Sequence, residues 1–374
     1  MNVVFDHFSF FVLRLPARPI SQLIEAIKTN PSKPSDLLYR LLQQSRLAEA
    51  IYLASPDLYL TWQMAQGKEM DPSLQKAMWR YLIRSYGRAT PYGLFAGLGV
   101  GTIGKTSRFE LGSNPWYNVS RTDSLVPITI AKSFTNDPQI RTLLRYTLNN
   151  SLYNVGDQYR FSERTDNLKS SIVLSSFQVT ADLTRLVDYL SKQGSASYAD
   201  LIRLYGEDFQ DEVSTYINQL IDDQFLVSQL NLPVTGLEMT DYLIDQIKQL
   251  PIQPTLYHQL VQAKQLLAES PVNLSTLEQV QSMFKDLIPE EPEGRTQALV
   301  QTDLFFAAKQ LELPSSTVVQ IARQFGQLRY CLYHPYVSPL ATLPSDSRID
   351  LMGRQLIYLL LSTLKSASDL CRTI

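Results

Sequence analysis

The apolar start of the chain, MNVVFDHFSFFVLRLP, predicts a β-strand that ends where Pro16 removes a backbone donor from the ladder. Beyond this strand, apolar positions recur at the spacing of a helix. Between two of these helical stretches, Ser55 is placed as an N-cap with Pro56 in the first turn. The predicted helices cover Ile20 to Lys28, Ser35 to Gln44, Arg46 to Tyr52, and a segment that ends at Arg88.

Strand-like patterns return after residue 93. Gly93 to Gly104 is rich in glycine and alternates with apolar residues, which suits a strand beside a site that needs close backbone approach. Phe109 to Val119 predicts further strands. Pro251 to Gln327 is mostly helical and is interrupted by the acidic loop IPEEPEG. A second interruption, Leu299 to Phe306, predicts a buried strand with one carboxylate, Asp303; a lone Asp near the end of an apolar run is more often a cap or a surface residue.

The middle of the chain has its own organisation. Leu152 to Phe161 and Leu168 to Val179 predict strands, the first with a turn at Gly156 and Asp157. Thr180 and Ser197 are placed as helix N-caps. The three helices and the closing strand that follow are Ala181 to Gln193, Tyr198 to Tyr205, Phe209 to Gln224, and Phe225 to Val227. This order of elements predicts a winged helix-turn-helix.

A winged helix most often binds DNA through basic side chains of its second helix. Here Arg203 faces several acidic residues, which argues against DNA: Glu207, Asp208, Asp211 and Glu212. A sheet edge of such a domain can instead take an extended peptide as an additional strand. A purely structural subdomain is the third interpretation.

Composition and charge then limit the class of protein. With 374 residues the chain is long for one core and is expected to form two or three subdomains of an α+β fold. No apolar stretch is long enough for a transmembrane helix, and the start lacks the basic region of a signal peptide. The net charge of −2 gives no general attraction to nucleic acid. Two cysteines and three scattered histidines predict a cytoplasmic protein without a structural metal or cofactor.

The main candidate chemistry lies in the run MWRYLIRSYGRATPYGLFAG. Arg80, Arg84 and Arg88 are four residues apart, so on a helix they form one row of cations. Such a row repels itself unless an anion or water compensates. Thr90 follows at a tight turn, where a hydroxyl and a guanidinium can hold an acyl or phosphoryl oxygen from two sides. A solvated basic face is the alternative interpretation.

Several segments in order resemble the N-terminal region of lantibiotic dehydratases over about residues 5 to 325. They are the strand that ends at Arg14-Leu15-Pro16, EAIYLASPDLY, RYLIRSYGRATPYGLFAG, Arg121-Thr122-Asp123, and TDLFF. The block TPYGLFAG is the most specific of them. In that family the region belongs to a glutamylation domain, which moves glutamate from glutamyl-tRNA onto Ser or Thr side chains of a precursor peptide. A separate elimination domain then removes the glutamate.

The resemblance implies roles for particular residues. Arg84, Arg88 and Thr90 are expected at the glutamylation site as catalytic residues. The expected substrate-binding residues are Arg14, Arg80, Asp123 and Asp303. The predicted winged helix resembles the element that binds the leader part of the precursor peptide. Glutamyl-tRNA is the expected co-substrate, with no cofactor and no metal.

The implied organisation has four parts. They are an N-terminal part of the glutamylation domain (1–149), the winged-helix recognition element (150–232), a helical continuation (233–334) and a divergent tail (335–374). The tail departs from the family pattern, and Arg354 to Leu364 is its one helical segment. Family members continue beyond this length, so a truncated or split enzyme that needs a partner chain is expected.

Three functions stay open at this point. The first is glutamyl transfer by a dehydratase component. The second is a catalytically inactive leader-peptide-binding module, and the third is a winged-helix regulator that binds nucleic acid. A homodimer is a further alternative for the assembly.

Overall fold

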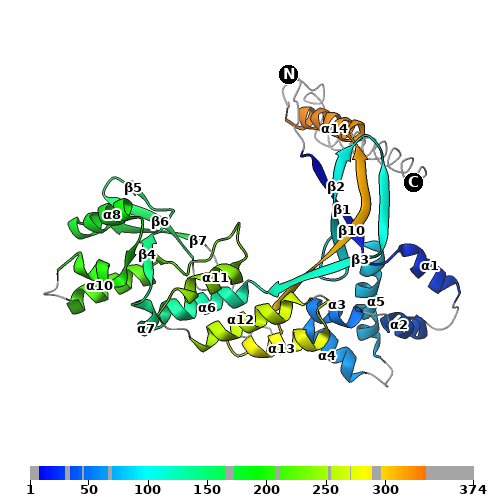
Figure 1. Cartoon of the computed structure of the whole chain (residues 1–374), viewed down its shortest axis with the longest axis horizontal. Helices are drawn as coiled ribbons and strands as arrows, with labels where there is room; N and C mark the ends of the chain where they lie inside the picture. The colour runs from blue at the N-terminus through cyan, green and yellow to red at the C-terminus, as the bar shows by residue number, and fades with distance from the viewer. Residues whose placement is uncertain are drawn as a thin grey trace, which may run out of the picture. The chain divides into compact units, whose positions relative to one another are not determined.

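The computed structural model gives an α+β protein in which helices alternate with three small sheets (Figure 1). It describes residues 8–29, 34–43, 46–65, 70–164, 172–206, 210–251, 254–269, 271–288 and 296–333, with Asn114 and residues 327–333 described by their backbone alone. The predicted tail, including Arg354 to Leu364, lies outside these ranges. So do most of the IPEEPEG loop and the side chains of both cysteines.

The chain divides into two compact units. The smaller unit comprises residues 1–13, 100–114 and 308–374, and the larger unit comprises 14–99 and 115–307. The strands of the four-stranded sheet carry residues of both units and follow the order β1-β2-β10-β3. They are β1 (Phe10–Pro16), β2 (Ala96–Gly104), β3 (Arg108–Thr122) and β10 (Val300–Pro314). The four domain boundaries drawn from the sequence stay predictions.

The strands predicted at the N-terminus and after residue 93 are present. The close backbone approach expected of the glycine-rich strand occurs at Gly97, where an added Cβ would lie 2.7 Å from the Leu304 carbonyl oxygen and 2.9 Å from the Trp116 ring. Packing against β10 therefore explains this glycine. In the smaller unit, Glu312 accepts backbone hydrogen bonds from Lys105 and Thr106 and so closes the turn between β2 and β3. Helix α14 (Ser315–Tyr333) follows β10.

Five helices form the first part of the larger unit. They are α1 (Ile20–Lys28), α2 (Pro34–Leu42), α3 (Leu47–Ala54), α4 (Pro56–Met64) and α5 (Pro72–Gly87). The predicted cap at Ser55 is confirmed, because its hydroxyl accepts from the Leu58 amide. Helix α5 begins at a similar cap, Asp71, followed by Pro72.

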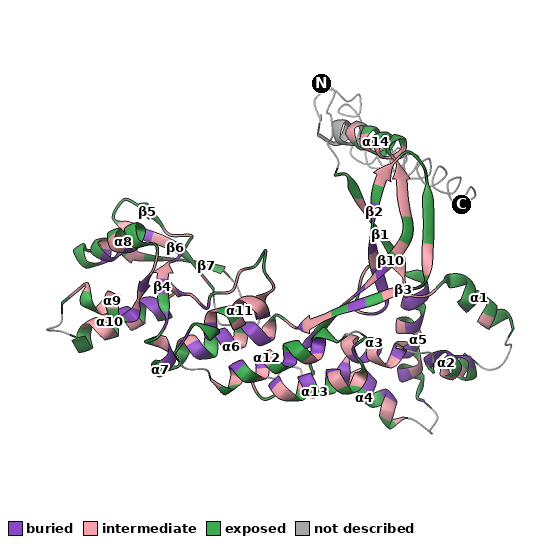
Figure 2. Cartoon of the chain, in the orientation of Figure 1, coloured by how far each residue is buried: buried purple, intermediate pink, exposed green. Residues whose placement is uncertain are grey.

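Helix α5 buries one face and turns another to solvent. Leu74, Met78, Leu82 and Tyr86 are four residues apart and buried. Buried positions of α5 are drawn in purple and exposed positions in green in Figure 2. The arginine row is offset by two positions from this stripe, about 200° around the helix. Because both rows repeat every four residues, the apolar row packs against the core while Arg80 on the opposite side stays exposed.

A second group of helices continues the core. It consists of α6 (Leu125–Asn136), α7 (Pro138–Arg141), α11 (Met239–Lys248), α12 (Thr255–Ala268) and α13 (Leu274–Phe284). Helix was predicted from the sequence for α12 and α13, but not for α6, α7 or α11. Val126, Ile130 and Phe134 of α6 are buried, so an apolar face was present in the sequence.

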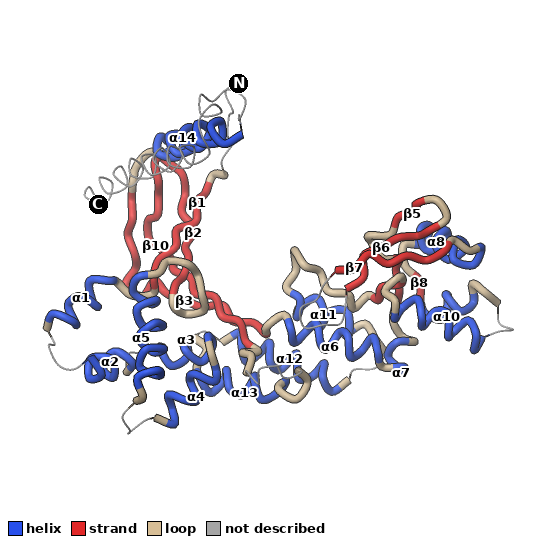
Figure 3. Tube along the Cα trace, turned by 180° about the vertical axis from the view of Figure 1, so that it is seen from behind, coloured by secondary structure: helices blue, strands red, loops and turns tan. Residues whose placement is uncertain are grey.

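The middle segment contains the predicted helices and two antiparallel sheets, β8-β4-β9 and β5-β6-β7 (Figure 3). Its strands are β4 (Arg145–Leu148), β5 (Tyr153–Val155), β6 (Gln158–Arg164), β7 (Ile172–Gln178), β8 (Ala196–Ser197) and β9 (Leu226–Ser228). Its helices are α8 (Ala181–Gln193), α9 (Tyr198–Arg203) and α10 (Gln210–Asp222).

The caps of this segment agree with the sequence analysis. The Thr180 hydroxyl accepts from the Leu183 amide, and Ser197 forms a capping box with Asp200. Helix α9 ends at Arg203, two residues earlier than predicted, and β4 was not foreseen. The assignment of these elements as a winged helix stays a prediction.

Candidate functional site

The arginine row lies at the C-terminal end of α5. The helix ends at Gly87, and Arg88 is its C-cap with extended backbone, held by a 3.1 Å hydrogen bond from its amide to the Arg84 carbonyl. Arg80, Arg88 and Thr90 are exposed, whereas Arg84 is half-buried. Arg88 therefore leaves the helical row, and Arg84 is the member that the fold partly encloses.

An aromatic ring accompanies the Arg84 guanidinium. Its central carbon lies 4.5 Å from the centroid of the Tyr92 ring, a cation–π distance. Its Nε is buried and has no hydrogen-bond partner among the described residues. The ring, and not a hydrogen bond at Nε, therefore sets the direction of this side chain.

Tyr92 is held by its own turn. The Phe95 amide donates a 3.0 Å hydrogen bond to the Tyr92 carbonyl, and Gly93 has φ +51°, a conformation that favours glycine. The rings of Tyr92 and Phe95 stack with centroids 6.1 Å apart. The Tyr92 hydroxyl reaches the Ala54 carbonyl at 3.5 Å, a long contact.

Tyr81, on α5, joins this group. Its ring centroid is 5.4 Å from that of Phe95. Burial raises the pKa of the Tyr81 phenol, and the neighbouring Tyr92, to which it is hydrogen-bonded, raises it further, while the Arg84 charge opposes the rise. Tyr81 is therefore a neutral hydrogen-bonding group next to the cation.

A shallow hollow of about 480 Å³ adjoins the same group. Asp57, one of its lining residues, accepts a 3.0 Å hydrogen bond from the Thr296 amide. The hollow is lined by Leu53, Ala54, Ser55, Pro56, Asp57, Tyr81, Thr296, Gln297 and Ala298. Its polar groups and its place beside Tyr81 make it part of the candidate site.

Of the two predicted carboxylates, Asp303 lies on β10 and Asp123 directly follows the end of the neighbouring strand β3. Asp303 accepts a 2.7 Å hydrogen bond from Arg121 and forms an ion pair with it. Asp123 caps the start of α6 by accepting from the Leu125 amide at 2.9 Å, and its own amide donates to the Leu299 carbonyl. Asp303 therefore pairs with Arg121. From the sequence, Arg121 was noted only as part of the motif Arg121-Thr122-Asp123. Arg14 is exposed on β1.

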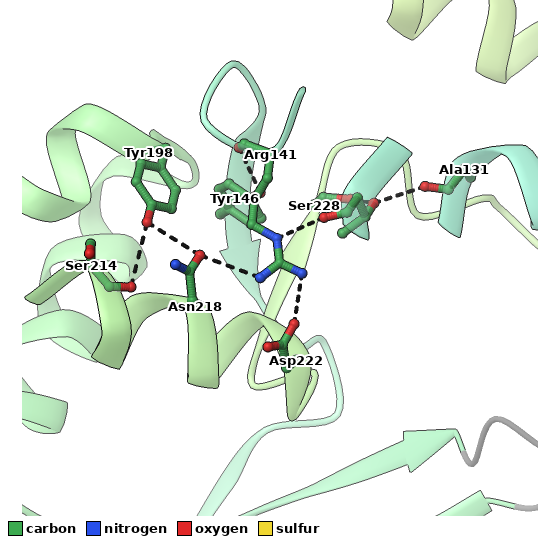
Figure 4. Close-up of polar contacts among 9 residues, drawn as sticks. Ala131, Arg141, Tyr146, Tyr198, Ser214, Asn218, Asp222 and Ser228 are labelled. Carbon is green, nitrogen blue, oxygen red and sulfur yellow. Dashed lines mark hydrogen bonds and ion pairs between the residues drawn. The ribbon is translucent and has the colours of Figure 1, made fainter. Parts of the chain in front are cut away.

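A different arginine, Arg141, is embedded in a polar cluster that sequence reasoning missed (Figure 4). Its Nε donates to the Thr135 carbonyl at 2.8 Å, and its two terminal nitrogens donate to Asn218 at 3.4 Å and Asp222 at 2.7 Å. The Tyr146 hydroxyl donates to the Arg141 carbonyl at 2.9 Å. These partners belong to α6, β4 and α10, so no local pattern could have shown the cluster.

No group of three or more His, Cys, Asp or Glu side chains in the part of the chain that the structure describes is arranged to hold a metal ion. In the same part of the chain, no helix is long and apolar enough to cross a membrane.

Comparison with known proteins decides the family. The sequence profile described as "Lantibiotic dehydratase, N terminus" matches residues 43–340, well over half of the chain. The chain belongs to the lantibiotic dehydratase family. The resemblance inferred from TPYGLFAG and its neighbouring motifs is therefore confirmed.

Two curated relatives of this dehydratase chain are proteins of lantibiotic biosynthesis. The subtilin biosynthesis protein SpaB of Bacillus subtilis is 26% identical over 258 residues, which are 66% of this chain and 24% of SpaB. The nisin biosynthesis protein NisB of Lactococcus lactis subsp. lactis is 26% identical over 190 residues, 49% of this chain and 18% of NisB. The chain thus spans about a quarter of the length of SpaB.

Solved structures share the fold of this lantibiotic dehydratase chain. The tRNA-dependent lantibiotic dehydratase MibB from Microbispora sp. 107891 superposes with a TM-score of 0.60 at 16% identity, covering 86% of this chain and 31% of MibB. The glutamylation domain of TbtB from thiomuracin biosynthesis, bound to 5'-phosphodesmethylglutamycin, gives a TM-score of 0.56 at 14% identity, covering 80% of this chain and 37% of that domain's chain. At these identities the likeness concerns the fold.

Proposed function

We propose that this chain takes part in glutamyl transfer, moving glutamate from glutamyl-tRNA to Ser or Thr hydroxyls of a ribosomal precursor peptide. Membership of the lantibiotic dehydratase family and the fold shared with the TbtB glutamylation domain support this assignment. The observation that carries it is the half-buried Arg84 guanidinium, in cation–π contact with Tyr92 and followed by the exposed Arg88 and Thr90.

The proposed reaction suits a site built from cations. The Ser or Thr oxygen attacks the glutamyl ester carbon, the bond from that carbon to the ribose oxygen breaks, and the hydroxyl proton ends on the ribose oxygen. Because the ester is already activated, catalysis needs positioning and stabilisation of the oxyanion. Arg84, Arg88 and Thr90 are the proposed catalytic residues. The proposed substrate-binding residues are Arg14, Arg80, Asp123 and Asp303.

The middle segment is the proposed site for the leader part of the precursor peptide. Strand β7 is the last in the order β5-β6-β7, so it offers one edge for an added strand. Ile172 and Leu174 are 71% and 58% exposed on it, and alternate side chains of this kind give a peptide apolar contacts. Strand addition by a peptide agrees with the proposed winged-helix assignment and needs no basic recognition helix.

A transfer assay tests the proposal. The full chain is incubated with precursor peptide and glutamyl-tRNA, with and without a second chain that supplies the remaining length of a dehydratase. Mass spectrometry then reports the gain of glutamyl groups. Arg88→Ala is expected to abolish the gain with an unchanged circular dichroism spectrum. Arg40→Ala, an exposed arginine in the last turn of α2, is the matched control.

Unchanged product from Arg88→Ala would remove that residue from the site. Absence of product from the wild-type chain, with every complementing chain supplied, would overturn glutamyl transfer itself.

The exposed β7 edge favours a second candidate, a leader-peptide-binding module without transfer. Fluorescence anisotropy of a labelled leader peptide would then show binding by a chain that yields no glutamylated product. Ile172→Lys together with Leu174→Lys is expected to weaken that binding at least tenfold, because two charges replace apolar contacts. Val234→Lys, at a residue 71% exposed and outside β7, is the control. Equal binding by both variants would place the peptide elsewhere.

A further inference from the structure

We propose that Tyr92 is the positioning residue for Arg84: its ring fixes the plane in which the guanidinium meets an anionic group of the substrate. This inference rests on the proposed function and deepens it. The proposal starts from the cation–π contact of 4.5 Å between the Arg84 guanidinium carbon and the Tyr92 ring centroid.

The buried Nε of Arg84 shows why a positioning residue is needed. Arginines in proteins are usually oriented by hydrogen bonds to their planar fork. Nε of Arg84 has no such bond among the described residues and is closed to solvent. Without the ring, the head of this side chain would lose the contact that limits its rotation.

The ring can do this work because it is itself fixed. Tyr92 stacks on Phe95, which is fully buried, at an interplanar angle of 18°. Its carbonyl accepts from the Phe95 amide across the turn at Gly93. Its hydroxyl makes a long 3.5 Å contact with the Ala54 carbonyl and is hydrogen-bonded to Tyr81. Tyr92 thus links the arginine to the rim of the hollow and to the core.

The Tyr92 ring also affects which N–H groups of the Arg84 guanidinium face a ligand. The Tyr92 ring lies on one side of the Arg84 guanidinium carbon, 4.5 Å from it, and the N–H groups of a guanidinium point outward within the plane of the fork. A carboxylate or phosphate that approaches in this plane can accept two parallel hydrogen bonds. The ring thereby selects an in-plane approach for the anion. The neighbouring Arg88, on extended backbone, adds charge without this restriction.

Steady-state kinetics of transfer by the complemented full chain test the proposal. Tyr92→Leu removes the ring and is expected to lower kcat/KM about twofold to fivefold, the size of a cation–π contact whose ring is 42% exposed. Tyr92→Phe keeps the ring and is expected to retain most of the activity. In an Arg84→Met background, Tyr92→Leu should cause no further loss, because its effect passes through Arg84. Equal losses in both backgrounds would overturn the proposal.

A second readout does not depend on activity. In a ¹⁵N spectrum, the Arg84 Nε–H resonance should shift on Tyr92→Leu through loss of the ring current and stay in place on Tyr92→Phe. Titration with 5'-phosphodesmethylglutamycin should give weaker binding for Tyr92→Leu alone. If the wild type transfers no glutamate but these shifts appear, the proposed function fails and the positioning role stands. An Arg84 Nε–H resonance that stays in place on Tyr92→Leu would overturn the positioning role. Tyr92→Gln replaces the leucine variant if the latter lowers the melting temperature.

Discussion

Arg84 and Arg141 lie in the same compact unit and are both partly enclosed, but their surroundings differ. Arg141 gives its guanidinium hydrogens to Thr135, Asn218 and Asp222, which tie α7 to α6 and α10. Arg84 rests on the ring of Tyr92, and its Nε has no partner among the described residues. All three nitrogens of the Arg141 guanidinium thus make hydrogen bonds that stabilise the fold.

Arg84 keeps hydrogen-bonding capacity that the fold does not use. Leaving a buried donor unpaired costs about 1 to 3 kcal/mol, a cost that is present at the Nε of Arg84 and avoided at the Nε of Arg141. Charge alone therefore does not separate a structural arginine from a functional one. The number of hydrogen-bond partners of the guanidinium separates the two kinds of arginine.

The largest effect is expected from Arg84→Met. Loss of a cation that stabilises the transition state should lower glutamyl transfer about a hundredfold to a thousandfold. The melting temperature should change little, because the unpaired Nε and the cation–π contact are removed together. Mass spectrometry and thermal denaturation measure the two outcomes. If Arg84→Met lowered the melting temperature and left glutamyl transfer unchanged, Arg84 would be a structural arginine.

Arg141→Met should do the opposite. Removing three hydrogen bonds from a guanidinium whose side chain is 12% exposed should cost about 1 to 3 kcal/mol, and Asp222 adds little because its side chain is 59% exposed and water solvates it. Urea denaturation measures this loss, and transfer per folded molecule should be unchanged. Arg203→Met is the control, because its ion pair with Asp200 is 63% exposed on the arginine side and should be worth about 0 to 1 kcal/mol.

Tyr146→Phe tests the backbone side of the Arg141 cluster. The Tyr146 ring is fully buried, and its hydroxyl is the donor to the Arg141 carbonyl. Its loss should cost about 1 kcal/mol in urea denaturation. Tyr153→Phe, at a ring 46% exposed on β5, is the matched control and should change little. Equal stability of both variants would show that the cluster depends on the guanidinium alone.

The smallest effect concerns the carboxylate that pairs with the exposed Arg203. Hydrogen bonds from the Ser197 hydroxyl and amide lower the pKa of Asp200. A lowered pKa contributes stability above the unfolded value of about 4, and this stability is lost as the pH falls through the folded value. Melting temperatures between neutral and acid pH should therefore fall less steeply for Asp200→Asn than for the wild type. Parallel curves would contradict this.

The elements that the sequence predicted well are those with local signals. Ser55, Thr180 and Ser197 were placed as N-caps, and each accepts the expected backbone hydrogen bond. The end of α1 and the end of α5 were predicted to within one residue. Caps and prolines act through neighbouring residues, so the sequence contains what is needed to place them. In contrast, α6, α7, α11 and β4 were missed, although α6 has an apolar face and Asp137 caps α7 ahead of Pro138.

For the candidate site, the sequence by itself determined which cations exist, their spacing along α5, and the motif that reveals the family. It also gave Asp303 as a single carboxylate in an apolar run, without indicating its ion-pair partner. The tertiary structure decided that Arg121 pairs with Asp303 across 182 residues, that Arg141 is a fixed structural group, and that Tyr92 lies against Arg84. Helical spacing and capping depend on near neighbours, whereas these contacts form only when distant segments fold together.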